Sequence, residues 1–116
     1  MYAGTSIEIC ALEKFVHLAG ALHPPLVLVS IDVPDTLLMQ APMTSLPKDW
    51  SDLPAPASTQ EFGRQWLESK NQLLMLVPSA IIPESLNALI NPMHPDYRDV
   101  RLAIVREFSF DARMFK

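Results

Sequence analysis

Prolines separate this chain into short segments. Proline lacks a backbone N–H and fixes φ, so regular elements usually end at it. The 116 residues include 11 prolines. Pro34 ends an apolar, β-branched run at residues 25–33, and Pro78 ends another at residues 72–77. Both runs are predicted to be buried strands.

Two helices are predicted from capping boxes, in which a hydroxyl and a carboxylate satisfy backbone N–H groups of the first turn. Thr5 and Glu8 form one box, and Ser58 and Glu61 form the other. The predicted helices span about residues 6–19 and 59–69. The first is apolar on nearly all sides, which is typical of a buried helix.

A loop of about two dozen residues, with four further prolines, is predicted between Pro34 and the second helix. Loops of that length are often functional. Apolar and polar side chains alternate over residues 101–110 well enough to predict a final strand. Residues 111–116 are predicted to form a terminal tail. The order of helix, strand, helix and then several strands predicts an α+β domain with a mostly antiparallel or mixed sheet.

Length and charge narrow the class of protein. A chain of 116 residues is long enough for one domain with a sizeable core. The net charge of −4 and pI near 5.2 argue against direct nucleic-acid binding, which needs a basic face. No apolar run approaches the ~20 residues of a membrane span. No signal-peptide pattern follows Met1, and Cys10 is the single cysteine, so a cytoplasmic location is predicted.

Glu13 is the first residue that suggests chemistry, because it lies on the apolar first helix. Such a carboxylate either reaches solvent at the edge of the helix or is held inward for a function. His17, four residues further on, is placed to be its salt-bridge partner. The spacing leaves both alternatives open.

The segment at residues 77–96, "VPSAIIPESLNALINPMHPD", holds a second group of polar residues among four prolines. Ser79 follows a strand-ending proline, and Asn87 lies eight residues later. Asn91 precedes a proline, which turn chemistry explains without a function. Ser79 taken alone is explained equally well as a cap at the end of a strand.

Three common site patterns are absent from the sequence. With three glycines in the chain, no glycine-rich phosphate loop can be formed. The cysteine and the histidines lack metal-ligand spacing, so no metal site is predicted. A triad of Ser79, His94 and Asp96 can be drawn, but no nucleophile-elbow motif supports it. A hydrolase using Ser79 and His94 is therefore a minor alternative.

Four blocks in order, covering nearly the whole chain from Tyr2 onward, resemble the RES domain. They are "YAGTSIEICALEKFVHL", "LPKDWSDLPAPASTQEFGRQWLES", "LMLVPSAIIPESLNALINPMHPD" and "FSFDARMF". The resemblance implies an ADP-ribosyltransferase-like fold and a bacterial toxin of a type II toxin–antitoxin pair. It also implies cleavage of the nicotinamide–ribose bond of NAD+, with transfer of ADP-ribose to water, phosphate or protein left open. The implied partner is an Xre-like antitoxin. The oligomeric state is left open, and a homo-oligomer within the toxin–antitoxin complex is one of the alternatives.

The resemblance places four residues on the family's NAD-site positions: Tyr2, Glu13, Ser79 and Asn87. It implies that Glu13 stabilises positive charge on the ribose, an oxocarbenium-like state as in glycoside cleavage. Tyr2 would stack on nicotinamide or fix a ribose hydroxyl. Ser79 and Asn87 would hydrogen-bond the ribose and amide edges.

The chain also departs from the family pattern. The family carries a conserved arginine for the phosphates upstream of the tyrosine, whereas Met1 directly precedes Tyr2 here. None of the five arginines occupies the matching motif: Arg64, Arg98, Arg101, Arg106 and Arg113. Residues 1–116 are therefore expected to be the C-terminal portion of a RES domain without the arginine-bearing segment. The alternative function is a truncated, inactive domain that only binds an antitoxin-like partner, for which the group at Arg98, Arg101 and Arg106 would offer a basic surface.

Overall fold

The structure is a computed structural model that describes residues 1–18, 25–34, 38–40 and 46–115. The strands are β1 (Tyr2–Gly4), β2 (Leu26–Asp32), β3 (Leu38–Gln40), β4 (Leu74–Pro78), β5 (Leu86–Ile90) and β6 (Arg101–Phe108). The helices are α1 (Ile7–Leu18) and α2 (Ala57–Ser69), with short 3₁₀ helices η2 (Pro95–Asp99) and η3 (Ala112–Phe115). The predicted α+β class is confirmed.

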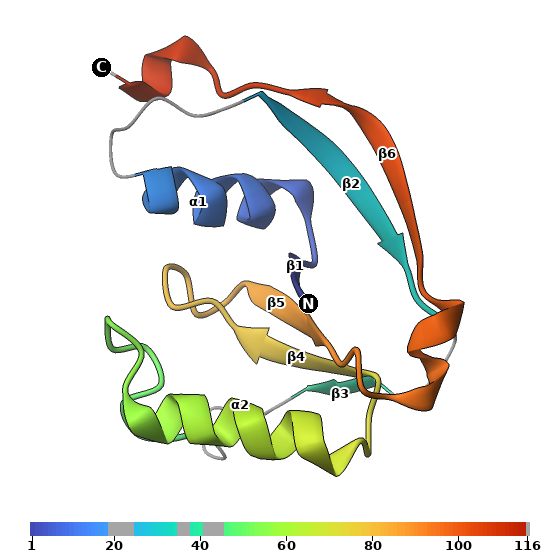
Figure 1. The fold of residues 1–116 in the computed structure, drawn as a ribbon. Coiled ribbons are helices and arrows are strands. Elements are labelled where there is room, and N and C mark those ends of the chain that lie inside the picture. The colour runs from blue at the N-terminus through green and yellow to red at the C-terminus, as the bar shows by residue number, and fades with distance from the viewer. Residues whose placement is uncertain (19–24, 35–37, 41–45, 116) are drawn as a thin grey trace.

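The strands form one sheet and a separate ribbon (Figure 1). The sheet has the order β1-β5-β4-β3, in which β3 runs parallel to β4 and the other neighbours are antiparallel. The ribbon pairs β2 with β6 antiparallel, with a bulge between Leu28 and Val29. The sheet is therefore mixed, as predicted.

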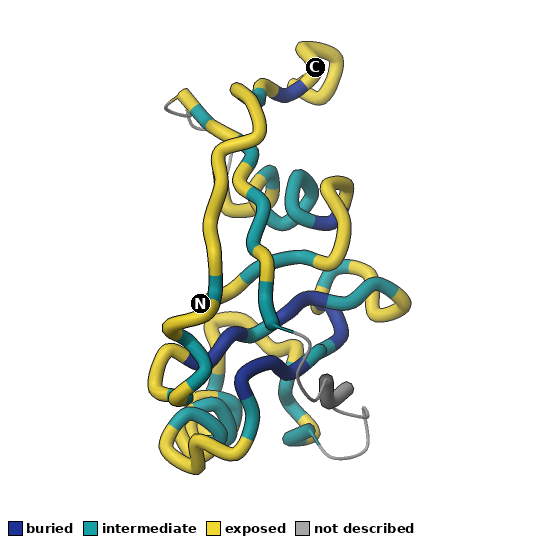
Figure 2. The backbone as a smooth tube through the Cα atoms, turned by 90° about the vertical axis from the view of Figure 1, so that its right-hand side faces the viewer, coloured by how far each residue is buried: buried dark blue, intermediate teal, exposed yellow. Residues whose placement is uncertain are grey.

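The core lies on the four-stranded sheet. Leu73, Leu74, Ala88 and Ile90 are buried there, and Ile31 from the end of β2 packs against them. Burial falls away along the ribbon, where β6 is exposed for most of its length (Figure 2). One end of the ribbon is thus attached to the core, and its other end extends beside α1 (Figure 1).

The start of α1 differs from the predicted capping box. The Thr5 hydroxyl donates to the backbone oxygen of Leu86 at 2.8 Å, and Ser6 Oγ accepts from Ile9 N–H at 3.2 Å. Thr5 continues the β1–β5 pairing through its own N–H. Its side chain therefore stays with the sheet, and the helix is capped one residue later.

The second predicted capping box is also wrong. The N-cap of α2 is Pro56, which makes no side-chain capping bond. Ser58 Oγ instead donates to Asp49 Oδ1 at 2.6 Å, and Glu61 is engaged by Arg64. Ser58 is thus bonded to a residue outside the helix, and Glu61 to a neighbour on the helix surface. These hydrogen bonds compete with the local cap.

The predicted strands at residues 25–33, 72–77 and 101–110 are confirmed as β2, β4 and β6. Three short strands were not predicted: β1, β3 within the expected loop, and β5 within the proline-rich segment. The expectation of a buried first helix is wrong, because only Ile9 of α1 is buried. The helix packs by one side, and the rest of its apolar surface is half-buried or exposed.

Candidate active site

The β1–β5 pairing places polar residues on the side of the sheet that faces α1. Gly4 is opposite Asn87, and Val77 of β4 is opposite Asn87 on its other side. Residues directly opposite one another in antiparallel strands present their side chains on the same face. Tyr2, two residues before Gly4, shares that face with Asn87.

Gly4 allows α1 to approach β1 closely. A Cβ at this position would lie 2.6 Å from Cys10 Sγ and 2.7 Å from Ile9 Cγ2. Any larger residue would therefore push the helix away from the strand. Because Glu13 lies on the turn after Cys10, this close approach brings its carboxylate to Asn87.

Glu13 Oε1 is held by two donors from different parts of the sheet. Ser79 Oγ and Asn87 Nδ2 each donate to it at 2.8 Å. Both donor residues are fully buried, with 0% of their surface exposed. Glu13 Oε2 makes no hydrogen bond within the described part of the chain and is available to a ligand.

Ser79 has no free hydrogen-bonding capacity. Its hydroxyl donates to Glu13 and accepts from the N–H groups of Ile81 at 3.1 Å and Ile82 at 3.3 Å. A hydroxyl offers one donor and two acceptor sites, and all three are used. Ser79 therefore positions Glu13 and the turn that follows β4.

Asn87 shows the opposite pattern. Its Nδ2 donates to Glu13 and, at 2.6 Å, to the Tyr2 hydroxyl. Its Oδ1 is buried and has no partner among the described residues. A buried acceptor without a donor is costly, so the two Nδ2 contacts hold Asn87 in this orientation at the expense of Oδ1.

The Tyr2 hydroxyl lies at the same point, although 57% of the residue is exposed. Burial of the hydroxyl, and then the negative charges of Glu13 and Cys10, raise the pKa of Tyr2 to about 12. The phenol therefore keeps its proton at neutral pH. Since Asn87 donates to the Tyr2 oxygen, that proton remains available to a ligand.

These side chains line a cavity of about 270 Å³ between α1 and the β1–β5 edge of the sheet. Its walls are Tyr2, Ala3, Gly4, Cys10, Glu13, Lys14, His17 and Asn87. Of the four residues predicted for the site, Tyr2, Glu13 and Asn87 line the cavity, and Ser79 lies behind Glu13. The structure thus gathers Glu13, Ser79 and Asn87 at one carboxylate, and Tyr2 joins them through Asn87 Nδ2.

Other residues singled out in the sequence lie outside this group. His17 Nδ1 contacts the backbone oxygen of Glu13 at 2.7 Å, so the predicted salt bridge to its carboxylate is wrong. Asn91 Oδ1 accepts from Met93 N–H at 2.9 Å, which confirms its turn role. His94 Nδ1 accepts from the N–H of Asp96 at 3.0 Å and caps η2, so it is not a partner of Ser79.

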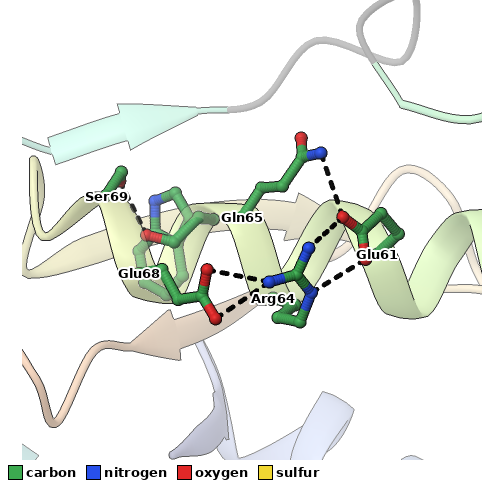
Figure 3. Close-up of polar contacts among 6 residues, drawn as sticks. Glu61, Arg64, Gln65, Glu68 and Ser69 are labelled. Carbon is green, nitrogen blue, oxygen red and sulfur yellow. Dashed lines mark hydrogen bonds and ion pairs between the residues drawn. The ribbon is translucent and has the colours of Figure 1, made fainter.

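No arginine is among the described residues that line the cavity. Arg64, on α2, is held between Glu61 and Glu68, with NH1 donating to Glu68 Oε2 at 2.8 Å (Figure 3). Arg113 is paired with Asp111 at 2.8 Å. Arg101 donates to the backbone oxygen of Arg98 at 2.8 Å. Arg106 lies over the ring of Phe108, 5.7 Å from its centroid.

The RES domain family model matches residues 1–112. The chain belongs to the RES domain family. The match covers the elements that build the cavity, from β1 and α1 to β5. The resemblance that the sequence blocks indicated is therefore confirmed.

Curated relatives of this RES domain carry toxin names. The chain is 41% identical over 120 residues to "Prs ADP-ribosylating toxin" of Sphingobium sp. (strain YBL2), covering 100% of this chain and 74% of the relative. It is 34% identical to "Toxin Res" of Photorhabdus laumondii subsp. laumondii, covering 100% of this chain and 76% of the relative. "Toxin Res" of Yersinia enterocolitica is 32% identical, and the match covers 98% of this chain and 76% of the relative.

Four lining residues of this RES domain were not singled out in the sequence as chemically important: Ala3, Gly4, Cys10 and Lys14. Cys10 shares a face of α1 with Glu13 and His17, three and seven residues away, and Lys14 lies four residues from Cys10. That spacing was a usable signal once Glu13 was known to point inward. Within the ranges that the structure describes, no helix is long and apolar enough to cross a membrane. Those ranges also contain no group of three His, Cys, Asp or Glu side chains arranged to hold a metal ion.

Proposed function

We propose that residues 1–116 form one RES domain that acts as a toxin and degrades NAD+ by cleaving the nicotinamide–ribose bond. The observation that carries this proposal is the pair of donors on Glu13 Oε1, which leaves Oε2 for a ligand in the cavity. The name of the relative from Sphingobium, an ADP-ribosylating toxin, supports NAD+ as the substrate.

The proposed reaction breaks the bond between the nicotinamide nitrogen and the ribose C1′. Nicotinamide leaves with the electron pair of that bond, and positive charge develops on the ribose. The Glu13 carboxylate, held in place before the reaction, stabilises that charge better than mobile water would. An acceptor then attacks C1′ and takes the ADP-ribose, and water, phosphate or a protein group would serve.

The surrounding residues orient the substrate in this proposal. Asn87 is a positioning residue, because its Nδ2 holds the Glu13 carboxylate and the Tyr2 hydroxyl that line the cavity. The Tyr2 hydroxyl donates to the ribose, or its ring stacks on nicotinamide. Ser79 is a positioning residue, since its hydroxyl is fully engaged with Glu13 and the turn backbone.

The test is nicotinamide release from NAD+ by the purified chain. Glu13→Ala is expected to abolish release, whereas Glu8→Ala, an exposed carboxylate on the same helix, should leave it unchanged. Undiminished release by Glu13→Ala would overturn the assignment of this site. The partner we propose is an Xre-like antitoxin that binds the chain and stops the reaction.

A second candidate is a domain that binds such an antitoxin without catalysis. It is favoured by one observation, the absence of an arginine from the cavity wall. Arginine is the usual bidentate partner of a phosphate. No nicotinamide release by the chain, together with tight binding of the antitoxin, would favour this candidate.

A further inference from the structure

Lys14 has a position on α1 that the proposed reaction does not use. It follows Glu13 directly and lines the cavity that contains Glu13 and Asn87. It also lines a second cavity of about 360 Å³, which shares Tyr2, Ala3 and Cys10 with the first. Lys14 therefore lies where the two cavities meet.

The second cavity has mostly apolar walls. Leu26, Leu28 and Phe108 of the ribbon line it, and Ile7 and Ala11 line it from α1. Leu26 is opposite Phe108 across the ribbon, so the side chains of Leu26, Leu28 and Phe108 lie on one face. Among the residues that the structure describes, Lys14 is the one charged side chain in these walls. An uncharged, flat, heteroaromatic group suits this space better than an ionic one.

The two cavities differ in the chemistry they offer. The first presents a carboxylate and a phenol, which suit a ribose and an amide. At about 270 Å³ it is small for a whole dinucleotide, because ligand sites usually span about 300–1,000 Å³. A molecule with a polar sugar end, a charged middle and an aromatic end would fill both, with its middle at Lys14.

Lys14 has its charge free for such a ligand. It makes no ion pair within the described ranges of the chain, where the salt bridges involve Arg64, His94 and Arg113. It is exposed, so its ammonium group can reach the boundary between the cavities. A lysine binds phosphate as a compact point charge, without the fork geometry of arginine.

We propose that Lys14 binds the diphosphate of an adenine dinucleotide and that the cavity between α1 and the ribbon holds its adenosine half. This inference rests on the proposed function for the identity of the dinucleotide. It assigns the phosphate contact to a residue of α1, immediately next to Glu13. The nicotinamide end then enters the first cavity, where Glu13 Oε2 is available.

Calorimetric titration with ADP tests this assignment, since ADP carries the diphosphate and the adenosine without the nicotinamide end. Lys14→Ala should weaken ADP binding about tenfold, the usual effect of one charge-assisted contact. Lys14→Arg should retain most of the affinity. Lys48→Ala, an exposed lysine far along the chain from α1, is the matched control and should change nothing.

A second variant tests the adenosine cavity. Ala11→Leu adds bulk there on a helix that tolerates leucine. It should weaken the binding of both ADP and adenosine, whereas Lys14→Ala should weaken ADP alone. In a reacting chain, Lys14→Ala should raise KM for NAD+ and leave kcat nearly unchanged, because the contact is made equally in the ground and transition states.

The outcomes separate this inference from the proposed function. ADP binding that is equal in Lys14→Ala and the parent chain overturns the inference, as does a parent chain that does not bind ADP. ADP binding that depends on Lys14, in a chain that releases no nicotinamide, supports the inference and counts against the proposed reaction. A loss of kcat with unchanged KM in Lys14→Ala would also overturn it.

Discussion

Glu13 and Asn87 are 74 positions apart in the chain and are joined by a hydrogen bond of 2.8 Å from Asn87 Nδ2 to Glu13 Oε1. This bond connects α1 to the second residue of β5. The same Nδ2 donates to the Tyr2 hydroxyl on β1, so one buried amide organises three elements. The candidate site is therefore part of the contact between α1 and the sheet.

The first prediction concerns this bond. Glu13→Ala and Asn87→Ala should be coupled by about 0.5–3 kcal/mol in a double-mutant cycle, because the residues share a hydrogen bond. Urea denaturation of the four proteins measures the coupling. The control pair, Glu8→Ala with Asn87→Ala, should be additive to within about 0.5 kcal/mol. Additivity in the Glu13 cycle would contradict the observed contact.

The second prediction concerns the closeness of α1 to β1. Gly4→Ala should lower the free energy of unfolding by about 1–3 kcal/mol, because its Cβ would meet Cys10 Sγ and Ile9 Cγ2. Cys10→Ala should recover part of this loss in the double variant. Gly63→Ala is the control, since nothing lies within 4 Å of its added Cβ and α2 should gain about 0.5–1 kcal/mol. Equal effects at the two glycines would contradict the close approach.

The third prediction concerns the titration of Tyr2. Its pKa is raised from 10.0 to about 12 by burial and by the charges of Glu13 and Cys10. The fold thus favours the neutral phenol, and this contribution is complete below pH 10 and is lost as the pH rises through 12. Tyrosinate absorbance of the chain, minus that of Tyr2→Phe, should give the raised value. Titration of Tyr2 at its ordinary pKa would count against a buried hydroxyl.

The fourth prediction concerns the reactivity of Ser79. Its hydroxyl is fully hydrogen-bonded and lies next to a carboxylate, with His94 engaged elsewhere. A fluorophosphonate probe should therefore leave Ser79 unlabelled, as judged by mass spectrometry. Ser79→Ala should reduce nicotinamide release through the loss of a Glu13 contact, with KM little changed. Labelling of Ser79 would revive the hydrolase alternative.

The fifth prediction separates Arg64 from the phosphate site. Its guanidinium is occupied by Glu61 and Glu68 on the surface of α2 (Figure 3). Arg64→Ala should therefore leave KM for NAD+ and the affinity for ADP unchanged. The comparison with Lys14→Ala is made in the same titrations. A tenfold loss of ADP affinity in Arg64→Ala would place the phosphates on α2 instead.

Periodicity and proline placement predicted the longer elements correctly. The β-branched runs became β2 and β4, and both helices lie within one or two residues of the expected ranges. Local capping was predicted poorly, because Thr5 and Ser58 bond to residues distant in sequence or across a turn. Short strands such as β1 and β5 carry too few residues for a periodic signal, and their pairing is decided by long-range contacts.

The sequence by itself predicted the longer helices and strands, the family resemblance and four polar residues that the structure brings together. Each of those depends on local pattern or on motifs readable along the chain. Only the tertiary structure decided that Glu13 points inward, that Ser79 is fully engaged, and that Glu13 Oε2 and Lys14 remain open to a ligand. These properties follow from the β1–β5 register and from the close packing that Gly4 permits, because hydrogen-bond partners of a buried group are set by which strands and helices meet around it.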